Sequence, residues 1–295
     1  MIKLIVTDMD GTLYSWVDYI VPSVEALVGS VMLSTGWPRI RIVQALKRVY
    51  AQNESNEYPF ALQESEIFDA FPEFDSFDKL VIEPARAAFA QARRKYLQLF
   101  PGVLDTLQTL KMKGLPVVAL TDAPRNPVEV RAKLLKIDGL LDAIYCLPGF
   151  TFPEHSDGRL KVSRMIAAKE QRGEYRAACR VVELPRDYEK PNPAGLLRIC
   201  AEMKVEPKEV LVIGDAAKKD VAVARKVGSI DCWAEYGTYI SQEYRERLEI
   251  VSAPAITQRH AASVHDAAAR AHAPETTHRL SNFNQLLEIL ELHGS

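Results

Sequence analysis

The chain has 295 residues, of which 47% are apolar and 26% charged, and its formal net charge is −2. These values are typical of a globular protein with a sizeable core, and they predict neither a nucleic-acid partner nor an anionic membrane partner. The four cysteines lack C-x-x-C spacing, which disfavours a disulfide framework or zinc site and favours a reducing, cytoplasmic compartment. No continuous apolar run reaches the length of a membrane span, and residues 1–6 do not resemble a secretory signal.

Short β-rich apolar runs predict buried parallel strands along the chain. They lie at residues 3–7, 115–120, 143–146 and 210–213. Helical patterns occupy 125–136, 193–203 and 218–227. In the first of these helices, the apolar residues that fall largely on one side are Val128, Val130, Leu134 and Leu135. Strands that alternate with helices predict an α/β fold, a Rossmann-like doubly wound parallel sheet with helices on both faces.

Residues 15–98 interrupt this alternation, because their apolar spacing is helical throughout. We expect an inserted all-helical cap domain there, closed by a turn at residues 100–102. The catalytic core would then comprise residues 1–14 and 99–295.

Three further segments have distinctive patterns. Residues 147–188 are long for a connection in an α/β fold. Residues 251–279 are rich in alanine and histidine and are expected to be mobile. Residues 280–292 predict a final amphipathic helix.

Polar clusters follow the predicted strands, at the edge where ligands bind in open α/β sheets. The clusters are Asp8-Met9-Asp10-Gly11-Thr12-Leu13, Thr121-Asp122, Lys190-Pro191-Asn192-Pro193, and Gly214-Asp215 with Asp220. They supply a nucleophile, an acid/base, a hydroxyl donor, a cation and hard oxygen ligands. Such a set suits phosphoryl transfer assisted by Mg²⁺, which prefers carboxylates and phosphate oxygens.

In this order, the four motifs resemble those of the haloacid dehalogenase (HAD) superfamily, phosphatase branch, with a first-position helical cap as in phosphoglycolate phosphatases. The similarity covers roughly residues 1–14 and 99–249. It implies that Asp8 is the nucleophile and Asp10 the general acid/base. It also implies that Thr121 binds the phosphoryl group, while Lys190 offsets the charge of the nucleophile and the phosphate.

The resemblance further implies a magnesium site. Asp215 would bind Mg²⁺ beside Asp8 and the backbone carbonyl of Asp10, and Asp220 would support the site. The helices at 15–98 resemble the cap that closes over the active site and helps to choose the substrate.

Two features depart from the family pattern. Asp122 stands where a small or amide residue is usual, and its charge beside a phosphate site implies that it points away. The spacing from Thr121 to Lys190 is also long, so Lys161 and Lys169 are alternatives to Lys190, which the Lys-Pro-Asn-Pro context favours.

Other residues have two interpretations. Trp16, Asp18 and Tyr19 either line the substrate pocket or pack within the cap, with packing favoured. A group of basic residues either binds an anionic substrate or forms a solvated face, which the interspersed acids favour: Arg159, Lys161, Arg164, Lys169, Arg172, Arg176 and Arg180. The six histidines have no metal-ligand spacing and receive no role.

The leading functional prediction is a magnesium-dependent phosphomonoester hydrolase that acts on a small phosphorylated metabolite through an aspartyl-phosphate. A phosphomutase or phosphotransferase would use the same residues and differ only in the acceptor of the phosphoryl group. A dehalogenase is disfavoured because its nucleophile needs no general acid at Asp10. A non-catalytic binding protein is disfavoured because every catalytic position is filled.

Overall fold

The computed structural model describes residues 1–71, 73–150, 172–174, 176–261 and 275–294. Within these ranges, seven parallel strands form a sheet in the order β4-β3-β2-β1-β5-β6-β7. The strands are β1 (Leu4–Thr7), β2 (Val117–Pro124), β3 (Ala143–Leu147), β4 (Arg180–Glu183), β5 (Val210–Gly214), β6 (Ile230–Ala234) and β7 (His278–Leu280).

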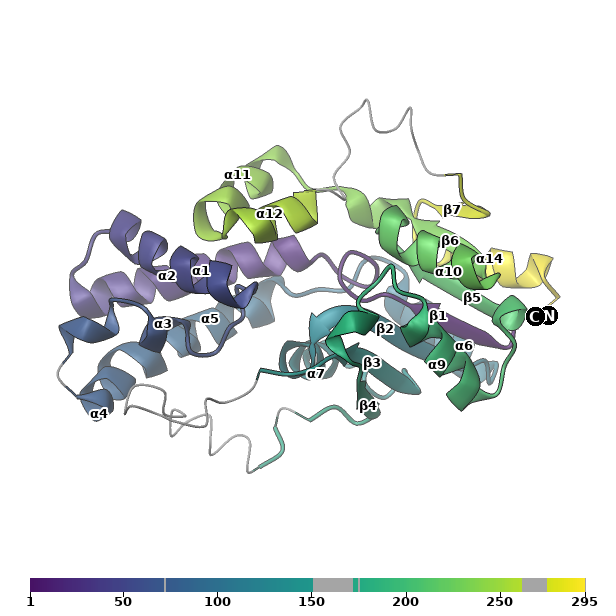
Figure 1. Cartoon of the computed structure of the whole chain (residues 1–295), viewed down its shortest axis with the longest axis horizontal. Coiled ribbons are helices and arrows are strands. Elements are labelled where there is room, and N and C mark those ends of the chain that lie inside the picture. Colours follow the sequence, from purple (N-terminus) through teal and green to yellow (C-terminus); the bar gives the residue numbers. More distant parts are fainter. Residues whose placement is uncertain (72, 151–171, 175, 262–274, 295) are drawn as a thin grey trace.

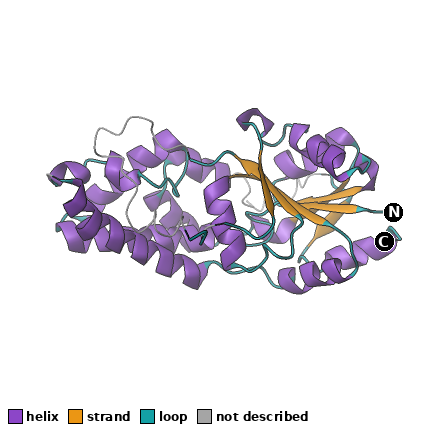
Figure 2. Ribbon diagram, turned by 90° about the horizontal axis from the view of Figure 1, so that it is seen from below, coloured by secondary structure: helices purple, strands orange, loops and turns teal. Residues whose placement is uncertain are grey.

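Helices cover both faces of this sheet (Figure 2). Successive residues of β1 point to opposite faces, so Leu4 and Val6 belong to one buried cluster and Ile5 to the other. The first cluster includes residues of α9 (Ala194–Met203) and α10 (Ala222–Val227). The second includes residues of α6 (Val103–Met112), α7 (Arg125–Leu134) and α14 (Gln285–Leu292). The predicted doubly wound α/β fold is therefore confirmed.

The described residues between 15 and 98 form helices and turns and no strand. The helices are α1 (Trp16–Thr35), α2 (Arg39–Asn53), α3 (Ala61–Glu64), α4 (Phe74–Phe77) and α5 (Glu83–Tyr96), with short 3₁₀ and π turns between them. We refer to residues 15–98 as the helical insertion. Its two connections to the sheet run together, because Tyr14 pairs with Leu99 and Phe100 N–H donates to the Leu13 carbonyl at 2.9 Å. In Figure 1 the insertion extends away from the sheet.

By length and composition alone, α1 is apolar enough to cross a bilayer, contrary to the expectation that no segment is. Its Asp18, Ser23 and Glu25 interrupt any continuous apolar run, which is why the sequence did not reveal it. Of its most apolar stretch, 56% is buried inside the structure, and the helix packs along α5. The same composition is found in core helices of soluble proteins.

The segment expected to be mobile is helical in its first part. It begins at the end of α11 (Gln242–Val251) and continues through α12 (Pro254–Ala261), where Ile256 is only 2% exposed. Residues 262–274 of the same prediction lie outside the described residues. The expectation of mobility is therefore wrong for 254–258, because Ala253 and Ile256 contribute to the apolar core.

α11 and α12 lie against the helical insertion (Figure 1). Lys47 Nζ donates to the Glu249 carbonyl at 2.7 Å, and Asn56 Nδ2 donates to Ser252 Oγ at 2.6 Å. These contacts join the C-terminal part of the chain to α2 and to the segment that follows it.

Several predicted elements have different bounds. The long connection at 147–188 contains β4, which pairs with β3. The final helix, predicted at 280–292, begins at Gln285 because Leu280 belongs to β7. The predicted apolar side of the helix at 125–136 is correct for Val128, which is buried, and wrong for Leu134, which is exposed. The buried face also includes Arg131 and Ala132.

Candidate active site

Asp8 and Lys190 meet at the carboxyl end of β1. Asp8 directly follows that strand, and Lys190 Nζ lies 3.0 Å from Asp8 Oδ1 and 2.6 Å from Asp220 Oδ1. The same ammonium group donates to the Leu120 carbonyl at 3.2 Å. Lys190 is only 5% exposed, so its charge acts on the two carboxylates in a low-dielectric environment.

Asp215 and Asp220 complete an acidic cluster with Asp8. One carboxylate oxygen from each of the three residues lies within 4.8 Å of the others. Asp215 N–H donates to Thr12 Oγ1 at 3.1 Å, which ties the end of β5 to the loop that follows β1. Hence residues distant in the sequence are fixed at one edge of the sheet.

Glycines allow the backbone to approach these carboxylates. Gly11 has φ +76°, and a Cβ added there would lie 2.4 Å from Asp215 Oδ2. A Cβ at Gly214 would lie 2.1 Å from Asp220 Cγ. Any side chain at either position would therefore displace an acid of the cluster.

Burial dominates the electrostatics of the cluster. Desolvation raises the pKa of Asp8 to about 7, although Lys190 opposes the shift. Desolvation also raises the pKa of Asp215 well above its ordinary value, and the charges of Asp8 and Asp220 add to the effect. Burial opposes the charge of Lys190, but the carboxylates of Asp220 and Asp8 outweigh it and raise the pKa of the ammonium group. Three carboxyl groups therefore share one lysine, and the raised pKa values mean that full ionisation of the cluster is unfavourable without a further cation.

A divalent cation fits this donor set. The cluster offers carboxylate oxygens, which are hard ligands suited to Mg²⁺, and a bound cation would favour the ionised form of these acids. Asp8 and Asp215 are the side chains that would hold the ion, and Asp220, whose oxygens accept hydrogen bonds from Lys190 Nζ and Ala216 N–H, would support the site. The Asp10 side chain is not part of the cluster, so its predicted contribution to the metal site rests on its backbone carbonyl alone.

Thr121 and Asp122 lie within β2, which continues to Pro124, so Thr121 does not stand at the turn into α7. Thr121 is buried, and its hydroxyl accepts a hydrogen bond from Ala123 N–H at 3.2 Å. Asp122 accepts hydrogen bonds from Lys190 N–H at 3.0 Å and from Lys219 Nζ at 2.8 Å. These two partners account for the unusual acid after Thr121.

Asp10 contacts a residue that the sequence did not single out. Arg131 Nη1, from α7, lies 3.0 Å from Asp10 Oδ1, 3.4 Å from Glu57 Oε2 and 2.7 Å from the Tyr19 hydroxyl. Burial raises the pKa of Asp10, while Arg131 opposes that shift. Burial also opposes the charge of Arg131, but the neighbouring Asp10 raises its pKa well above the ordinary value. Arg131 thereby joins the core to two residues of the helical insertion.

The structure shows the surroundings of several residues for which the sequence allowed two interpretations. Asp18 is exposed in the first turn of α1, where its N–H donates to Ser15 Oγ, and Trp16 is buried in the core. Tyr19 instead contacts Arg131 beside Asp10. Of the basic group, Arg172 pairs with Glu174 and Arg180 with Glu202 at the surface. Lys161 and Lys169, with Arg159 and Arg164, lie outside the described residues.

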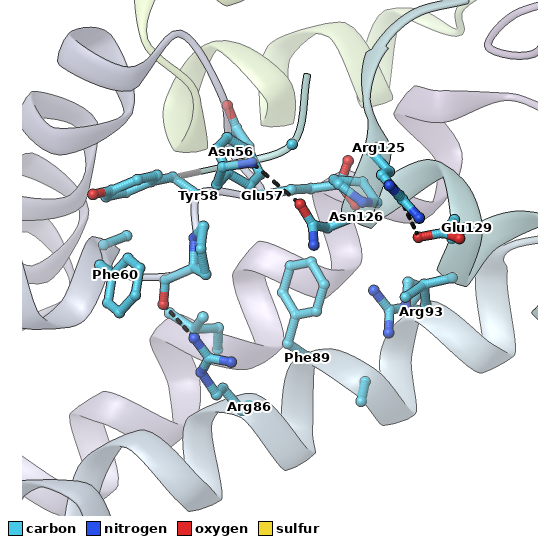
Figure 3. A pocket seen from close by; sticks show the side chains of 18 of the residues that line it. Asn56, Glu57, Tyr58, Phe60, Arg86, Phe89, Arg93, Arg125, Asn126 and Glu129 are labelled. Atoms are coloured by element: carbon cyan, nitrogen blue, oxygen red, sulfur yellow. Dashed lines mark hydrogen bonds and ion pairs between the residues drawn. The ribbon is translucent and has the colours of Figure 1, made fainter. Parts of the chain in front are cut away.

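Glu57 borders a cavity of about 870 Å³. Figure 3 shows its lining from three parts of the chain. Asn56, Glu57, Tyr58 and Phe60 come from the segment after α2; Arg86, Phe89 and Arg93 from α5; and Arg125, Asn126 and Glu129 from the start of α7. The cavity thus lies between the helical insertion and the core.

Comparisons with known proteins identify a family for the chain. Residues 2–228 match the model of the haloacid dehalogenase-like hydrolase family, and residues 188–272 match a HAD-hydrolase-like model. The chain is 26% identical over 229 residues to phosphoglycolate phosphatase 1 of Pseudomonas aeruginosa, covering 77% of this chain and 66% of the relative. It is 25% identical over 166 residues to glyceraldehyde 3-phosphate phosphatase of Pyrococcus furiosus, covering 56% and 54%. The chain thus spans less than two thirds of the length of these two relatives.

Solved structures show the same fold. A 2-haloacid dehalogenase from Pseudomonas syringae pv. Tomato DC3000 aligns with a TM-score of 0.52 at 19% identity, over 99% of this chain and 100% of that one. A candidate β-phosphoglucomutase from Thermotoga maritima aligns with a TM-score of 0.52 at 15% identity, over 99% of both chains. Since the family model covers most of the sequence, the chain belongs to the haloacid dehalogenase-like hydrolase family.

Proposed function

We propose that the protein is a phosphatase that hydrolyses a phosphomonoester of a small metabolite, with Mg²⁺ as cofactor. The observation that carries the proposal is the buried contact between Lys190 and Asp8, beside Asp215 and Asp220. Family membership and the phosphatase relatives support it. A reducing, cytoplasmic location is part of the proposal and is supported by four free cysteines.

Asp8 is the proposed nucleophile. Its carboxylate oxygen forms a bond to phosphorus while the bond from phosphorus to the leaving oxygen breaks, which gives an aspartyl-phosphate. Lys190 holds the Asp8 carboxylate in place and offsets charge on the phosphoryl oxygens. Thr121 is proposed to donate its hydroxyl to the phosphoryl group, and the Lys190 contact with Asp220 keeps the ammonium group in position.

Asp10 is the proposed general acid/base. It gives a proton to the leaving oxygen in the first step and takes one from the attacking water in the second, which releases phosphate and restores Asp8. Asp8, Asp215 and the Asp10 carbonyl would hold Mg²⁺, supported by Asp220; when bound, the ion neutralises phosphate charge.

The helical insertion is the proposed cap. Tyr19 and Glu57 both contact Arg131, which contacts Asp10, so residues of the insertion lie next to the proposed acid/base. The paired connections at Tyr14 and Leu99 are the proposed hinge. A cap over the site would exclude bulk water and contact the leaving group.

The test compares the wild type with Asp8→Asn and Asp10→Asn, on a panel of phosphate esters with and without Mg²⁺. We expect Asp8→Asn to abolish turnover, because an amide is a poor nucleophile. Asp10→Asn should lower the rate by roughly 10²- to 10⁴-fold, and less for a nitrophenyl ester, whose leaving oxygen needs no proton. EDTA should stop turnover and Mg²⁺ should restore it.

Three results would contradict the assignment. They are more than a few percent residual activity in Asp8→Asn, an Asp10→Asn loss that is equal for good and poor leaving groups, and full activity in metal-free protein. Transfer to an added sugar hydroxyl in preference to water would identify a phosphotransferase instead.

A further inference from the structure

Arg131 has unused hydrogen-bonding capacity in a buried position. Its residue exposure is 0%, and within the described part of the chain its hydrogen bonds and ion pairs are all made by Nη1. Its Cζ also lies 5.7 Å and 5.9 Å from the ring centroids of Tyr14 and Tyr19. Nε and Nη2, which carry most of the guanidinium's N–H donors, have no hydrogen-bond partner within the described part of the chain. Buried donors without partners destabilise a protein, so these atoms suit an acceptor that arrives from outside.

Glu57 offers the complementary group. Its Oε2 contacts Arg131 Nη1, while Oε1 is buried and has no hydrogen-bond partner among the residues that the structure describes. A carboxylate oxygen is an acceptor only, so Oε1 suits an incoming donor. Arg131 therefore lacks acceptors for Nε and Nη2, and the neighbouring Glu57 lacks a donor for Oε1.

A hydroxyl group satisfies both needs, because it donates one hydrogen bond and accepts others. A carboxylate satisfies only Arg131 and would meet the charges of Glu57 and Asp10. These two acids already share the single guanidinium, so another anion would find more repulsion than attraction. The chemistry of the pair thus favours a neutral, hydroxylated group over an acidic one.

The location of the pair matches the position of a leaving group. Under the proposed function, the leaving oxygen must come within hydrogen-bond reach of Asp10, which contacts Arg131 directly. Glu57, which contacts Arg131 Nη1, lies on the wall of the 870 Å³ cavity (Figure 3). The atoms attached to the leaving oxygen would therefore lie near this pair.

We propose that Arg131 and Glu57 select phosphate esters of polyols, whose leaving group is an uncharged carbon chain with neighbouring hydroxyls. The inference rests on the proposed function and narrows its substrate class. The proposed substrate preference differs from that of an enzyme that hydrolyses phosphate esters of hydroxy acids. Glu57 comes from the helical insertion and Arg131 from the core, so both sides of the site take part in the selection.

The test uses two probes that differ at one carbon. Glycerol 3-phosphate ends in CH₂OH where 3-phosphoglycerate ends in a carboxylate. Binding of each to the Asp8→Asn variant with Mg²⁺ is measured by calorimetry, so that turnover plays no part. We expect the polyol ester to bind about tenfold more tightly or better, the effect of a hydrogen bond to a charged group. Equal binding, or tighter binding of the carboxylate, would overturn the proposal.

A second arm assigns the preference to Glu57. Glu57→Gln, made in the Asp8→Asn protein, should reduce the ratio of the two affinities about tenfold, because the amide carries no charge and can donate to a carboxylate. Glu66→Gln is the matched control, since Glu66 lies in the same insertion and its ion pair, at 3.7 Å from Arg41, is exposed at the surface. An equal ratio in both variants would contradict the role of Glu57.

The proposed function fails separately from this inference. If wild-type protein with Mg²⁺ does not hydrolyse nitrophenyl phosphate or glycerol 3-phosphate, the phosphatase proposal is wrong. The binding ratios in the Asp8→Asn proteins still decide whether the pair selects hydroxyls. Circular dichroism of each variant confirms that the compared proteins are folded.

Discussion

Gly237 lies against the loop that carries the proposed nucleophile, and its replacement by alanine is a sharp test of the geometry. A Cβ at Gly237 would lie 1.5 Å from the Gly11 carbonyl oxygen, whereas real Cβ atoms essentially never approach closer than 3.0 Å. The two backbones must therefore separate by about 1.5 Å more. The loop cannot move alone, because the Tyr236 hydroxyl donates to the Thr12 carbonyl at 2.6 Å.

We expect Gly237→Ala to lower kcat/KM by about 100-fold, since a displacement of about 1 Å in a catalytic group has that effect. Overpacking should also reduce the free energy of unfolding by about 1–3 kcal/mol. The assay is hydrolysis of nitrophenyl phosphate with Mg²⁺, measured beside thermal unfolding.

Gly29→Ala is the control for Gly237→Ala. Gly29 lies inside α1, and an added Cβ there meets nothing within 4 Å. This variant should keep wild-type activity and gain up to about 1 kcal/mol, because alanine is the better helix former. Equal activity in the two variants would refute the argument that Gly237 fixes the catalytic loop.

Three further predictions concern buried charges and a buried hydrogen bond. In EDTA, the free energy of unfolding should fall by an amount on the order of 4 kcal/mol as the pH rises from about 4 to above 7. Folding raises the pKa of Asp8 from 3.8 to about 7, so the folded state binds the proton more tightly. Urea unfolding at about pH 4 and pH 8 checks this, and a difference unchanged in Asp8→Asn would contradict it. Lys190→Met should lower the free energy of unfolding by about 3–5 kcal/mol at pH 8, because it leaves buried carboxylates without their cation. A decrease in the free energy of unfolding below about 1 kcal/mol in the same assay would show that water or ions replace the lysine. Ser252→Ala should lower the free energy of unfolding by about 1–3 kcal/mol, because it leaves Asn56 Nδ2 without its buried partner. Arg247→Ala breaks a partly exposed ion pair with Glu25 and should lower the free energy of unfolding by about 1 kcal/mol or less. Similar melting temperatures for the two variants would be inconsistent with this ranking.

Most of the inner strands could be predicted because they are buried on both faces, although β2 continues to Pro124 beyond its predicted end at 120 and β6 was not predicted. β1, β3 and β5 are continuous apolar runs and begin and end within about a residue of their predicted limits. The outer strands gave no such signal. β4 reads Arg-Val-Val-Glu with exposed ends, and β7 has three residues with one buried, so neither differs from a loop in sequence.

The acids and the lysine of the cluster could be predicted because each follows a strand or opens a helical turn in a fixed motif. Arg131 and Glu57 could not. In sequence, Arg131 stands among Val130, Ala132 and Lys133 and resembles a solvated helix position, yet its side chain is fully buried. Only the tertiary structure brings Asp10, Glu57 and Tyr19 around it and makes burial of that charge tolerable.

The site therefore contains two buried cations, each shared by two acids. Lys190 contacts Asp8 and Asp220, whereas Arg131 contacts Asp10 and Glu57. Near Lys190 a third carboxylate adds further negative charge, which favours a metal ion. Near Arg131 the remaining capacity consists of unpaired donors and one acceptor, which favours a neutral polar ligand. Because Asp8 and Asp10 are divided between the two cations, the phosphoryl group and the leaving group can each meet a different electrostatic environment.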